Sequence, residues 1–280
     1  MIGQHPELAG LPELKLFATR TVGELEAPLS RYWRERGVTY RSPGLVRALA
    51  QLEFGGQSPE AMASAMSWLH ARKHWRGPQV LDVLLERLAP RSAVEKSPDH
   101  VLNPAALRRI KRAYPKARYL HLTRHPVTSQ ASMVKHWKRT LPPDSLEDEP
   151  MNGIAAWLDA HTRILGFTAR LSADHVLRLR AEDVLNDPAA NLRRIARWLG
   201  VRDDKAAIEA MRHPEASPFA RHDPRASGIH GGNDPDFLHD PIPRCVALPP
   251  MVKQPPGWQG DAPLWQATVA LAHLLGYPTG

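Results

Sequence analysis

The sequence predicts an α/β fold in which helices cover a parallel sheet. Short runs rich in β-forming residues alternate with segments that repeat apolar residues at helical spacing. Proline and glycine stand where these segments start or end. The 280 residues are 42% hydrophobic, which is enough for a sizeable core. Strands that alternate with helices are typical of a parallel sheet.

The expected elements follow from these patterns. The expected helices cover residues 78–91, 104–114, 126–140, 153–171, 187–201 and 263–277. The expected strands cover residues 92–96, 117–124 and 175–185. Pro126 stands in the first turn of its helix, where a missing N–H does no harm. Asp187 is the expected cap and Pro188 the first residue of the helix that ends at Gly200.

Residues 204–245 have a different character. Most of this segment is dense in Pro, Gly, His and Asp, so we expect an irregular loop within a single domain of residues 1–280. The scattered Phe219, Arg221 and Phe237 favour an ordered covering loop over a linker.

Composition excludes some classes of protein. No run of eighteen apolar residues occurs, and the acidic N-terminal stretch is no secretory signal, so we expect no membrane span. The single Cys245 excludes an internal disulfide and suits a cytoplasmic location. Lys and Arg number 37 against 29 Asp and Glu, which favours an anionic partner. No zinc signature or basic–aromatic repeat supports nucleic-acid binding.

The strongest local signal is "YLHLTRHPVTSQASMV", residues 119–134. A strand ends at Arg124, a tight turn follows, and a helix with several hydroxyl side chains begins. Backbone N–H groups at a helix start attract anions, and an arginine adds a charged donor. This pattern predicts phosphate binding, although an ordinary joint with a solvated polar face has the same pattern.

Five stretches in order resemble PAPS-dependent sulfotransferases, where PAPS is 3′-phosphoadenosine 5′-phosphosulfate. Arg124 followed by Ser132 resembles the family's 3′-phosphate-binding element, and "VEKSPDH" resembles its Lys-Ser/Thr-Pro element. The other three stretches are "GQHPELAGLPELKLF", "VLRLRAEDVLNDPAANLRRIARWLGV", and "HPEASPFA" with "GGNDPDFL". They resemble the segment after the first helix, a strand–turn–helix, and a late glycine-containing loop.

The resemblance implies a P-loop NTPase-like, three-layer α/β/α sulfotransferase fold with a central parallel sheet. PAPS is then the sulfuryl donor, PAP the product, and no metal is needed. Arg124 and Ser132 hold the 3′-phosphate. Gly231 and Gly232 let the late loop, residues 204–245, close over the nucleotide, because glycine permits close backbone approach. An ordinary turn is the alternative for the glycine pair.

The resemblance also implies catalytic residues. Glu13 stands in an apolar "LPEL" context and is the candidate general base, with a surface capping glutamate as the alternative. Lys96 is the candidate for charge stabilisation, and a strand-edge salt bridge is its alternative. His100 is a second candidate base. Some family members have a histidine two residues after the lysine, but Pro98 stands there, which favours Glu13.

The family's phosphate loop, of the Pro-Arg-Ser-Gly-Thr-Thr kind, does not occur in the sequence. By family order the first strand and this loop should precede Met1. We expect that the chain is a truncated form of an active member; a naturally shortened protein that binds PAPS poorly is the alternative. The coding DNA upstream of Met1 tests this expectation.

The sequence therefore predicts transfer of a sulfuryl group from PAPS to a hydroxyl of a small-molecule or carrier-bound acceptor. The alternative is a catalytically impaired sulfotransferase-like protein that binds nucleotide or a partner without turnover. Residues 41–75 are expected to form helices over the acceptor side, where Trp68 and Trp75 line an apolar pocket or pack in the core. The sequence specifies neither the acceptor nor the oligomeric state.

Overall fold

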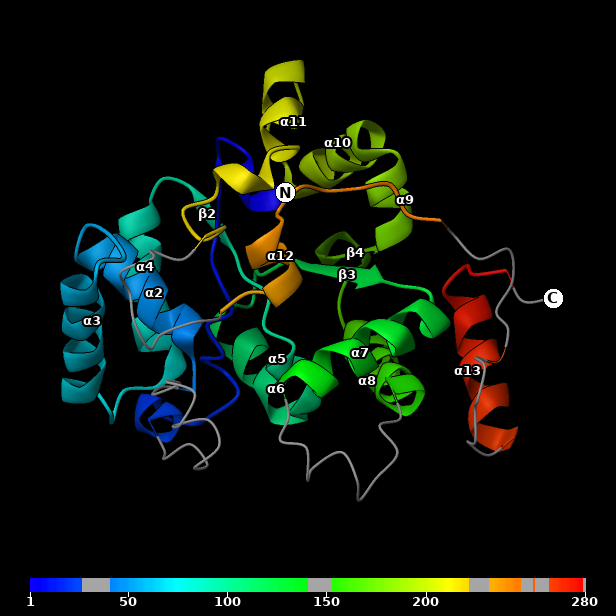
Figure 1. Ribbon diagram of the computed structural model, residues 1–280, viewed down its shortest axis with the longest axis horizontal. Coiled ribbons are helices and arrows are strands. Elements are labelled where there is room, and N and C mark those ends of the chain that lie inside the picture. Colours follow the sequence, from blue (N-terminus) through cyan, green and yellow to red (C-terminus); the bar gives the residue numbers. More distant parts are fainter. Residues whose placement is uncertain (27–40, 141–152, 222–231, 248–253, 255–261, 279–280) are drawn as a thin grey trace. The chain divides into compact units, whose positions relative to one another are not determined.

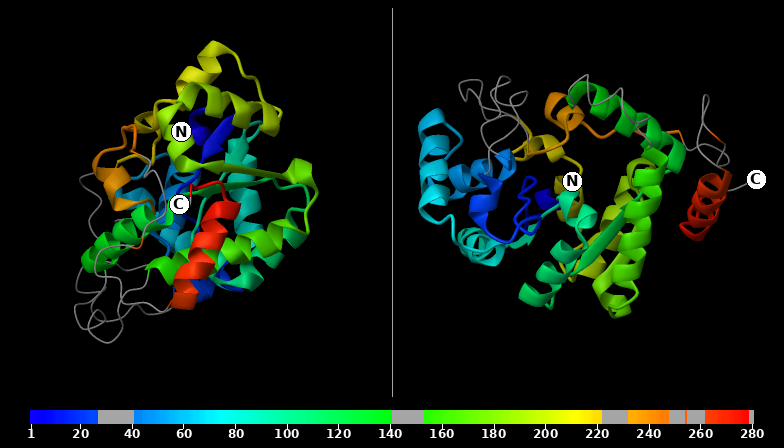
Figure 2. Two further views of the ribbon diagram at one scale, coloured as in Figure 1. Left: turned by 90° about the vertical axis from the view of Figure 1, so that its right-hand side faces the viewer. Right: turned by 90° about the horizontal axis from the view of Figure 1, so that it is seen from below.

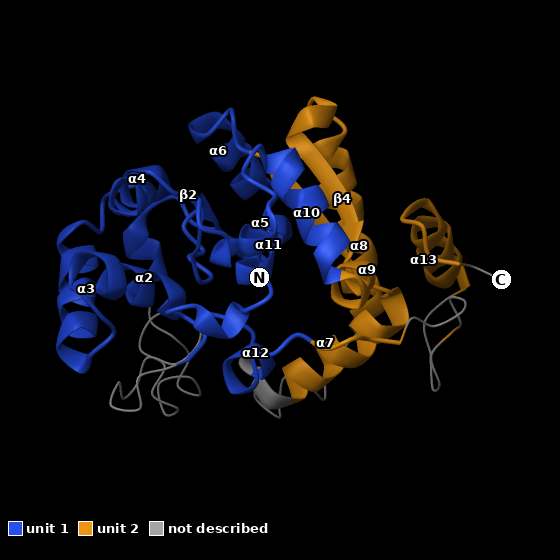
Figure 3. Cartoon of the chain, turned by 90° about the horizontal axis from the view of Figure 1, so that it is seen from above, with its two compact units in different colours: residues 1–117, 188–243 blue, residues 118–187, 244–280 orange. Residues whose placement is uncertain are grey.

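The computed structural model describes residues 1–26, 41–140, 153–221, 232–247, 254 and 262–278 (Figure 1). The chain divides into two compact units (Figure 3). Unit 1 comprises residues 1–117 and 188–243, and unit 2 comprises residues 118–187 and 244–280. The structure is mixed α/β and mostly helical. Among the described residues, none of the helices is long and apolar enough to cross a membrane.

Unit 1 contains one parallel strand pair and most of the helices. Strand β1 (Leu8–Gly10) pairs with β2 (Ser92–Val94). Its α-helices are α2 (Pro43–Glu53), α3 (Pro59–Ala71), α4 (Gly77–Leu88), α5 (Asp99–Leu102), α6 (Pro104–Ala113), α10 (Pro188–Leu199), α11 (Lys205–Met211) and α12 (Pro235–His239). Short 3-10 helices are η1 (Ile2–Gln4), η2 (Val22–Leu25) and η5 (Pro214–Ala216).

A polar cap followed by proline starts several helices of unit 1. The Ser42 hydroxyl accepts a hydrogen bond from the Leu45 N–H at the start of α2, and Ser58 caps α3 in the same way. In both helices proline occupies the first position, where its missing N–H is not needed. The caps therefore fix where α2 and α3 begin.

The core of unit 1 lies among α2, α3 and α4. Helix α2 packs against both α3 and α4 (Figures 1 and 2). Leu45 and Leu49 of α2, Leu69 of α3 and Leu84 of α4 have no exposed surface. Burial of each such leucine contributes about 2 kcal/mol of hydrophobic stabilisation. The same core includes apolar residues that follow β1, so it supports the part of the chain that carries the candidate site.

Unit 2 is built on a second parallel pair. Strand β3 (Tyr119–Thr123) pairs with β4 (Val176–Arg180) in the register Tyr119↔Val176 to Thr123↔Arg180. Its helices are α7 (Pro126–Thr140), α8 (Gly153–Thr168), the 3-10 helix η4 (Ala173–His175), α9 (Ala181–Asn186) and α13 (Ala262–Leu274). Helix α8 packs against β3, α7 and α13, with Trp157 and Leu271 in the shared core.

Most expected elements are confirmed within a few residues. One strand was predicted too long: β4 ends at Arg180, and residues 181–186 form α9 instead. Arg180 pairs with Asp183 three residues later, and Glu182 and Asp183 occupy the first helical turn, where carboxylates are favourable. Strand β1 was not predicted, because three residues are too short to show alternation.

Two expectations differ from the structure in detail. In the described residues the parallel strands form two separate pairs rather than one central sheet, because hydrogen bonding joins only β1 to β2 and β3 to β4. The three-layer order stays a prediction. Residues 204–245 are not wholly irregular, since α11, η5 and α12 lie within them. Their role in covering a donor stays a prediction as well.

Candidate functional site

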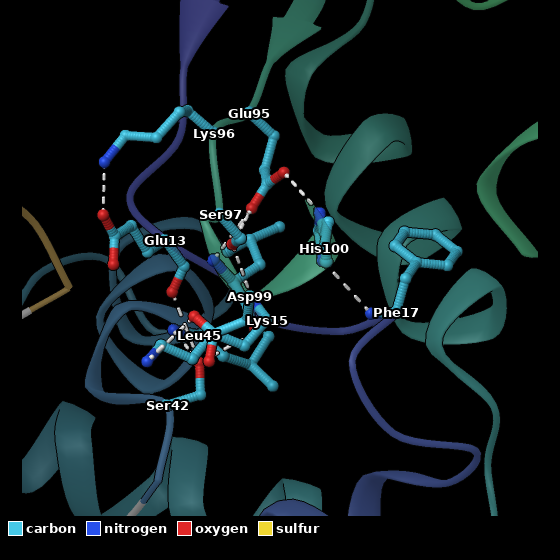
Figure 4. Close-up of polar contacts among 11 residues, drawn as sticks. Glu13, Lys15, Phe17, Ser42, Leu45, Glu95, Lys96, Ser97, Asp99 and His100 are labelled. Atoms are coloured by element: carbon cyan, nitrogen blue, oxygen red, sulfur yellow. Dashed lines mark hydrogen bonds and ion pairs between the residues drawn. The ribbon is translucent and has the colours of Figure 1, made fainter. Parts of the chain in front are cut away.

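Two segments of unit 1 run side by side beyond the parallel strands β1 and β2. We call residues 11–17 the Glu13 segment and residues 94–100 the Lys96 segment. Backbone pairing extends one step past β1, where the Leu11 N–H donates to the Val94 carbonyl at 2.8 Å. Beyond this point, side chains of the Lys96 segment bind the Glu13 segment (Figure 4). The site thus lies at the carboxyl ends of parallel strands, where open α/β folds bind ligands.

Glu13 and Lys96, two of the predicted catalytic residues, form an ion pair (Figure 4). The Glu13 side chain is 16% exposed and the Lys96 side chain 66% exposed. Exposed ion pairs add at most about 1 kcal/mol to stability, so folding alone gives little reason for this one. The pair places a carboxylate that can accept a proton beside an ammonium that can stabilise negative charge.

The Glu13 backbone is held on both sides. Its N–H donates to the Gly232 carbonyl at 2.6 Å, and its carbonyl accepts a hydrogen bond from the Ser42 hydroxyl at 3.3 Å. The start of α2 packs directly against it, because a Cβ atom added to Gly44 would lie 2.3 Å from the Glu13 carbonyl oxygen. The rigid backbone leaves the carboxylate as the movable part of Glu13.

A side-chain ladder joins the two segments. Its three hydrogen bonds run from Leu14 N–H to Glu95 Oε1 at 3.1 Å, from Lys15 N–H to Ser97 Oγ at 2.9 Å and from Phe17 N–H to His100 Nε2 at 3.4 Å. Lys15 has a φ of 55°, in the left-handed region that few residues other than glycine adopt. The ladder therefore supports a turn that the backbone alone disfavours.

Glu95 is the central acceptor of the ladder. Its Oε1 also accepts a hydrogen bond from the Ser97 hydroxyl. Burial raises the pKa of Glu95 to about 7; the hydrogen bonds from Ser97 and Leu14 oppose this rise, the charge of Glu13 adds to it, and that of Lys96 opposes it. The carboxyl group therefore titrates near neutral pH, although it was not predicted as a site residue.

His100, the second candidate base, is buried within the ladder. Because its Nε2 accepts the Phe17 N–H, the ring proton is assigned to Nδ1, which faces Glu95 Oε2 at 3.6 Å. Burial lowers the pKa of His100 to about 4. The ring is held neutral with its lone pair in use, which favours Glu13 over His100 as the base.

Gly232, one of the predicted donor-binding glycines, packs against the start of α2. It has a φ of +84°, and an added Cβ atom would lie 2.4 Å from the Gly44 Cα. Glycine is thus required here by packing and by backbone conformation. Gly231 lies outside the described residues.

The chain just before residues 222–231, which lie outside the described part of the structure, is anchored to α2 as well. The buried Arg47 guanidinium donates to the Phe219 carbonyl at 3.3 Å and to the Arg221 carbonyl at 2.6 Å. Asn233 donates to the Phe219 carbonyl at 3.2 Å, which links the two described ends of this segment. Segment 204–245 is therefore fixed at Phe219, Arg221 and Gly232.

Arg124 and Ser132, the predicted 3′-phosphate residues, both belong to unit 2. Arg124 is exposed between β3 and α7, and its carbonyl accepts the Trp157 indole N–H at 2.9 Å. Ser132 lies on α7 and is partly exposed. The described structure thus fixes the Arg124 backbone and leaves its side chain at the surface, which suits an anion.

A buried glutamate holds the joint between β3 and α7. Glu182 accepts the His125 N–H at 2.7 Å and the Tyr277 hydroxyl at 3.1 Å. The Tyr277 hydroxyl also lies 3.1 Å from that of Thr123. This network fixes the turn that begins directly after Arg124.

Sequence reasoning missed Glu95 and Glu182, which support the predicted residues. One signal could have found Glu95: in an extended chain, residues 95 and 97 point to the side opposite residue 96. No comparable signal marks Glu182, because its partners lie far away in sequence. In the described residues no group of three His, Cys, Asp or Glu side chains could hold a metal ion.

Known proteins are similar to this chain in sequence and fold. A model of the sulfotransferase family matches residues 1–205. The sulfotransferase domain from the curacin biosynthetic pathway is 21% identical with a TM-score of 0.74, over 100% of this chain and 92% of that one. The sulfotransferase domain from the Synechococcus PCC 7002 olefin synthase is 25% identical with a TM-score of 0.69, over 100% of this chain and 89% of that domain. No match is found among curated proteins.

Proposed function

Because the chain belongs to the sulfotransferase family, we propose that it transfers a sulfuryl group from PAPS to the hydroxyl of a small-molecule or carrier-bound acceptor. The bond between sulfur and the bridging oxygen of the 5′-phosphosulfate breaks, and a bond between sulfur and the acceptor oxygen forms. PAP leaves with the bridging oxygen, and the hydroxyl proton passes to a base. The observation that carries this proposal is the Glu13–Lys96 pair at the carboxyl ends of β1 and β2.

Each residue of the pair has one role in this reaction. Glu13 takes the proton from the acceptor hydroxyl, and its fixed backbone supports the precise placement that such proton transfer needs. Lys96 stabilises negative charge that develops on the bridging oxygen or on the acceptor. Its greater exposure supports this role, since the ammonium can leave Glu13 and approach a substrate.

Arg124, Ser132, Gly231 and Gly232 are the proposed donor-binding residues. An exposed guanidinium after a strand and a hydroxyl on the following helix suit a phosphate group. The two glycines would bring the backbone of segment 204–245 close to the nucleotide. The close packing of Gly232 on Gly44 already explains one glycine by structure alone, so the donor role of that residue needs its own test.

Binding of PAP tests the donor site. Isothermal calorimetry should detect PAP binding to the full chain, and Arg124→Ala should weaken it roughly 10- to 100-fold, because a charge-assisted hydrogen bond is worth about 1.5–3 kcal/mol. Arg170→Ala is the matched control, since Arg170 is an exposed arginine of unit 2 outside the proposed site. Absence of PAP binding, or equal affinities of both variants, contradicts the donor assignment.

The second candidate function is a sulfotransferase-like protein that binds nucleotide or a partner without turnover. PAP binding without transfer from labelled PAPS to any acceptor in a screen would favour it. The acceptor screen should begin with hydroxylated small molecules and carrier-bound chains, because the two similar domains come from a biosynthetic pathway and from an olefin synthase. Salt-sensitive DNA affinity without PAP binding would instead support a nucleic-acid-binding protein.

A further inference from the structure

Glu95 has a position that the proposed reaction does not yet use. It is an ionisable carboxyl group behind the Glu13–Lys96 pair, and both of its oxygens face other groups. Oε1 accepts the Leu14 N–H and the Ser97 hydroxyl, and Oε2 faces His100 Nδ1 at 3.6 Å. A surface carboxylate that only adds solubility needs none of these contacts.

Neighbouring side chains at residues 95 and 96 of the Lys96 segment point in opposite directions (Figure 4). Lys96 points towards the Glu13 carboxylate, whereas Glu95 points towards the backbone that carries it (Figure 4). The amide that Glu95 binds belongs to Leu14, the residue directly after Glu13. Glu95 therefore holds the N–H end of the peptide unit between Glu13 and Leu14, whose carbonyl end is bound by Ser42.

We propose that Glu95 is a positioning residue, whose ionised carboxylate fixes the Leu14 amide and so places the Glu13 carboxylate against Lys96. This inference rests on the proposed role of Glu13 as the base. Glu95 acts through the backbone and does not touch the reacting atoms. Its contribution is the precision of the Glu13 position, to which proton transfer is sensitive.

The charge state of Glu95 matters because an ionised carboxylate accepts hydrogen bonds with both oxygens. A proton taken up on Oε2 would face the Nδ1–H of His100, and a proton taken up on His100 Nε2 would displace the Phe17 N–H. The first location places two hydrogen-bond donors against each other between Glu95 and His100, and the second removes the ladder contact between Phe17 and His100. Proton uptake by the Glu95–His100 pair should therefore loosen the Glu13 segment.

Several charged groups set the pH at which the Glu95–His100 pair takes up a proton. Burial raises the pKa of Glu95 to about 7, with Glu13 adding to the rise and Lys96 opposing it. Around His100, Asp99 favours the protonated ring, whereas Arg109 and Lys15 oppose it. Turnover should accordingly fall as the pH decreases through about 7, because the ionised fraction of Glu95 falls in this range.

Glu95→Gln imitates the protonated state at every pH. The amide has one acceptor and one donor, so either the Leu14 N–H or the His100 Nδ1–H meets an N–H group instead of an oxygen. We expect kcat to fall roughly 10- to 100-fold with an unchanged KM for PAPS, and the decline through pH 7 to disappear. Glu86→Gln is the matched control, because Glu86 is an exposed glutamate of α4 outside the ladder.

A second measurement does not depend on turnover. Hydrogen exchange of the Leu14, Lys15 and Phe17 amides should accelerate below pH 7 relative to the intrinsic rate, both in the wild type and in Glu13→Gln. Glu95→Gln should exchange fast across the whole range, whereas Glu86→Gln should match the wild type. Slow, unchanged Leu14 exchange in Glu95→Gln overturns the positioning role.

The two measurements separate this inference from the proposed function. If no acceptor is sulfated by the wild type but Glu95 still controls exchange, the reaction assignment fails and the structural part of the inference holds. If sulfation proceeds but Glu95→Gln keeps normal kcat and the normal pH profile, the positioning role is wrong and the proposed function stands.

Discussion

The Glu13 backbone is bound at its own amide, at its carbonyl and at the following amide of Leu14. Its carboxylate, in contrast, contacts a lysine whose side chain is 66% exposed. A fixed backbone with a carboxylate beside a movable cation is expected of a base that must receive a substrate. At the scale of single residues, this arrangement therefore favours Glu13 over the buried His100 as the proposed base.

Substitution of Glu13 tests this assignment. Glu13→Gln keeps the size of the side chain and removes the proton acceptor, so kcat should fall about 10²-fold or more. PAP affinity should stay nearly unchanged, because the donor is held by other residues. Turnover of labelled PAPS and calorimetry with PAP measure the two quantities.

Glu7→Gln is the control for this substitution, since Glu7 is an exposed glutamate just before β1. Its turnover should equal that of the wild type. Near-normal turnover of Glu13→Gln would remove Glu13 from the mechanism.

At the scale of elements, the start of α2 is the support on which the Glu13 segment rests. Ser42 caps the helix and binds the carbonyls of Glu13 and Leu14, and Gly44 packs on the Glu13 backbone. Gly232 packs on Gly44 in turn. One helix start thus holds together two segments that are far apart in the sequence.

This packing predicts that even an alanine at residue 44 lowers the stability of the fold. In Gly44→Ala the new Cβ atom meets the Glu13 carbonyl oxygen at 2.3 Å, so the backbone must move, at a cost of about 1–3 kcal/mol in the free energy of unfolding. Urea unfolding measures this difference. Gly56→Ala is the control, because nothing lies within 4 Å of an added Cβ atom and no loss is expected. Equal midpoints for both variants would contradict the close approach.

Element types were predictable where local signals agree. Pro126 and a run of β-forming residues before it predicted both β3 and α7, and Asp187 with Pro188 predicted α10. The short β1 was missed, because its partner β2 lies more than eighty residues away in the chain and supplies the pairing. Glu13 and Lys96 were predicted by resemblance. Glu95 was missed because its contact to the Glu13 segment is the backbone amide of Leu14, about eighty residues away in sequence, and only the alternation of side chains at residues 95–97 could have indicated it.

At the scale of the whole molecule, buried titratable groups differ between the two units. In unit 2, His121 Nε2 lies 2.8 Å from His161 Nδ1, and burial lowers the pKa of His121 to about 3 and of His161 to about 4. In unit 1, the lowered pKa of His100 makes stability fall in acid, whereas the raised pKa of Glu95 makes stability rise in acid, so the two effects offset each other. Acid should therefore destabilise unit 2 more than unit 1.

The direction of this stability change with pH follows from proton binding. An unfolded histidine binds its proton near pH 6.5, whereas the folded His121 and His161 stay neutral until about pH 4 or below, so stability falls as the pH decreases from 6.5 towards 4. At pH 5 the loss is roughly 2 kcal/mol for each histidine. Hydrogen exchange at pH 7 and at pH 5 measures this difference. Between these two values the protection of the β3 amides in unit 2 should fall more than that of the β2 amides in unit 1.

A variant separates this effect from general acid sensitivity. His161→Gln should lower stability at pH 7 but flatten its dependence on pH, because one titrating group is gone. His175→Gln is the control, since His175 is a partly exposed histidine of the same unit. An unchanged slope in His161→Gln would show that the pair does not govern the acid response.

The side-chain ladder also constrains how this protein can be recombined with its relatives. Donors at residues 14, 15 and 17 match acceptors at residues 95, 97 and 100, and neither set keeps the even spacing of a regular strand pair. Because the donors are backbone N–H groups, only the acceptor side depends on side-chain identity. A chimera whose residues 94–100 come from a parent without these acceptor side chains would lose the ladder, so this segment restricts the choice of parents more than residues 11–17 do.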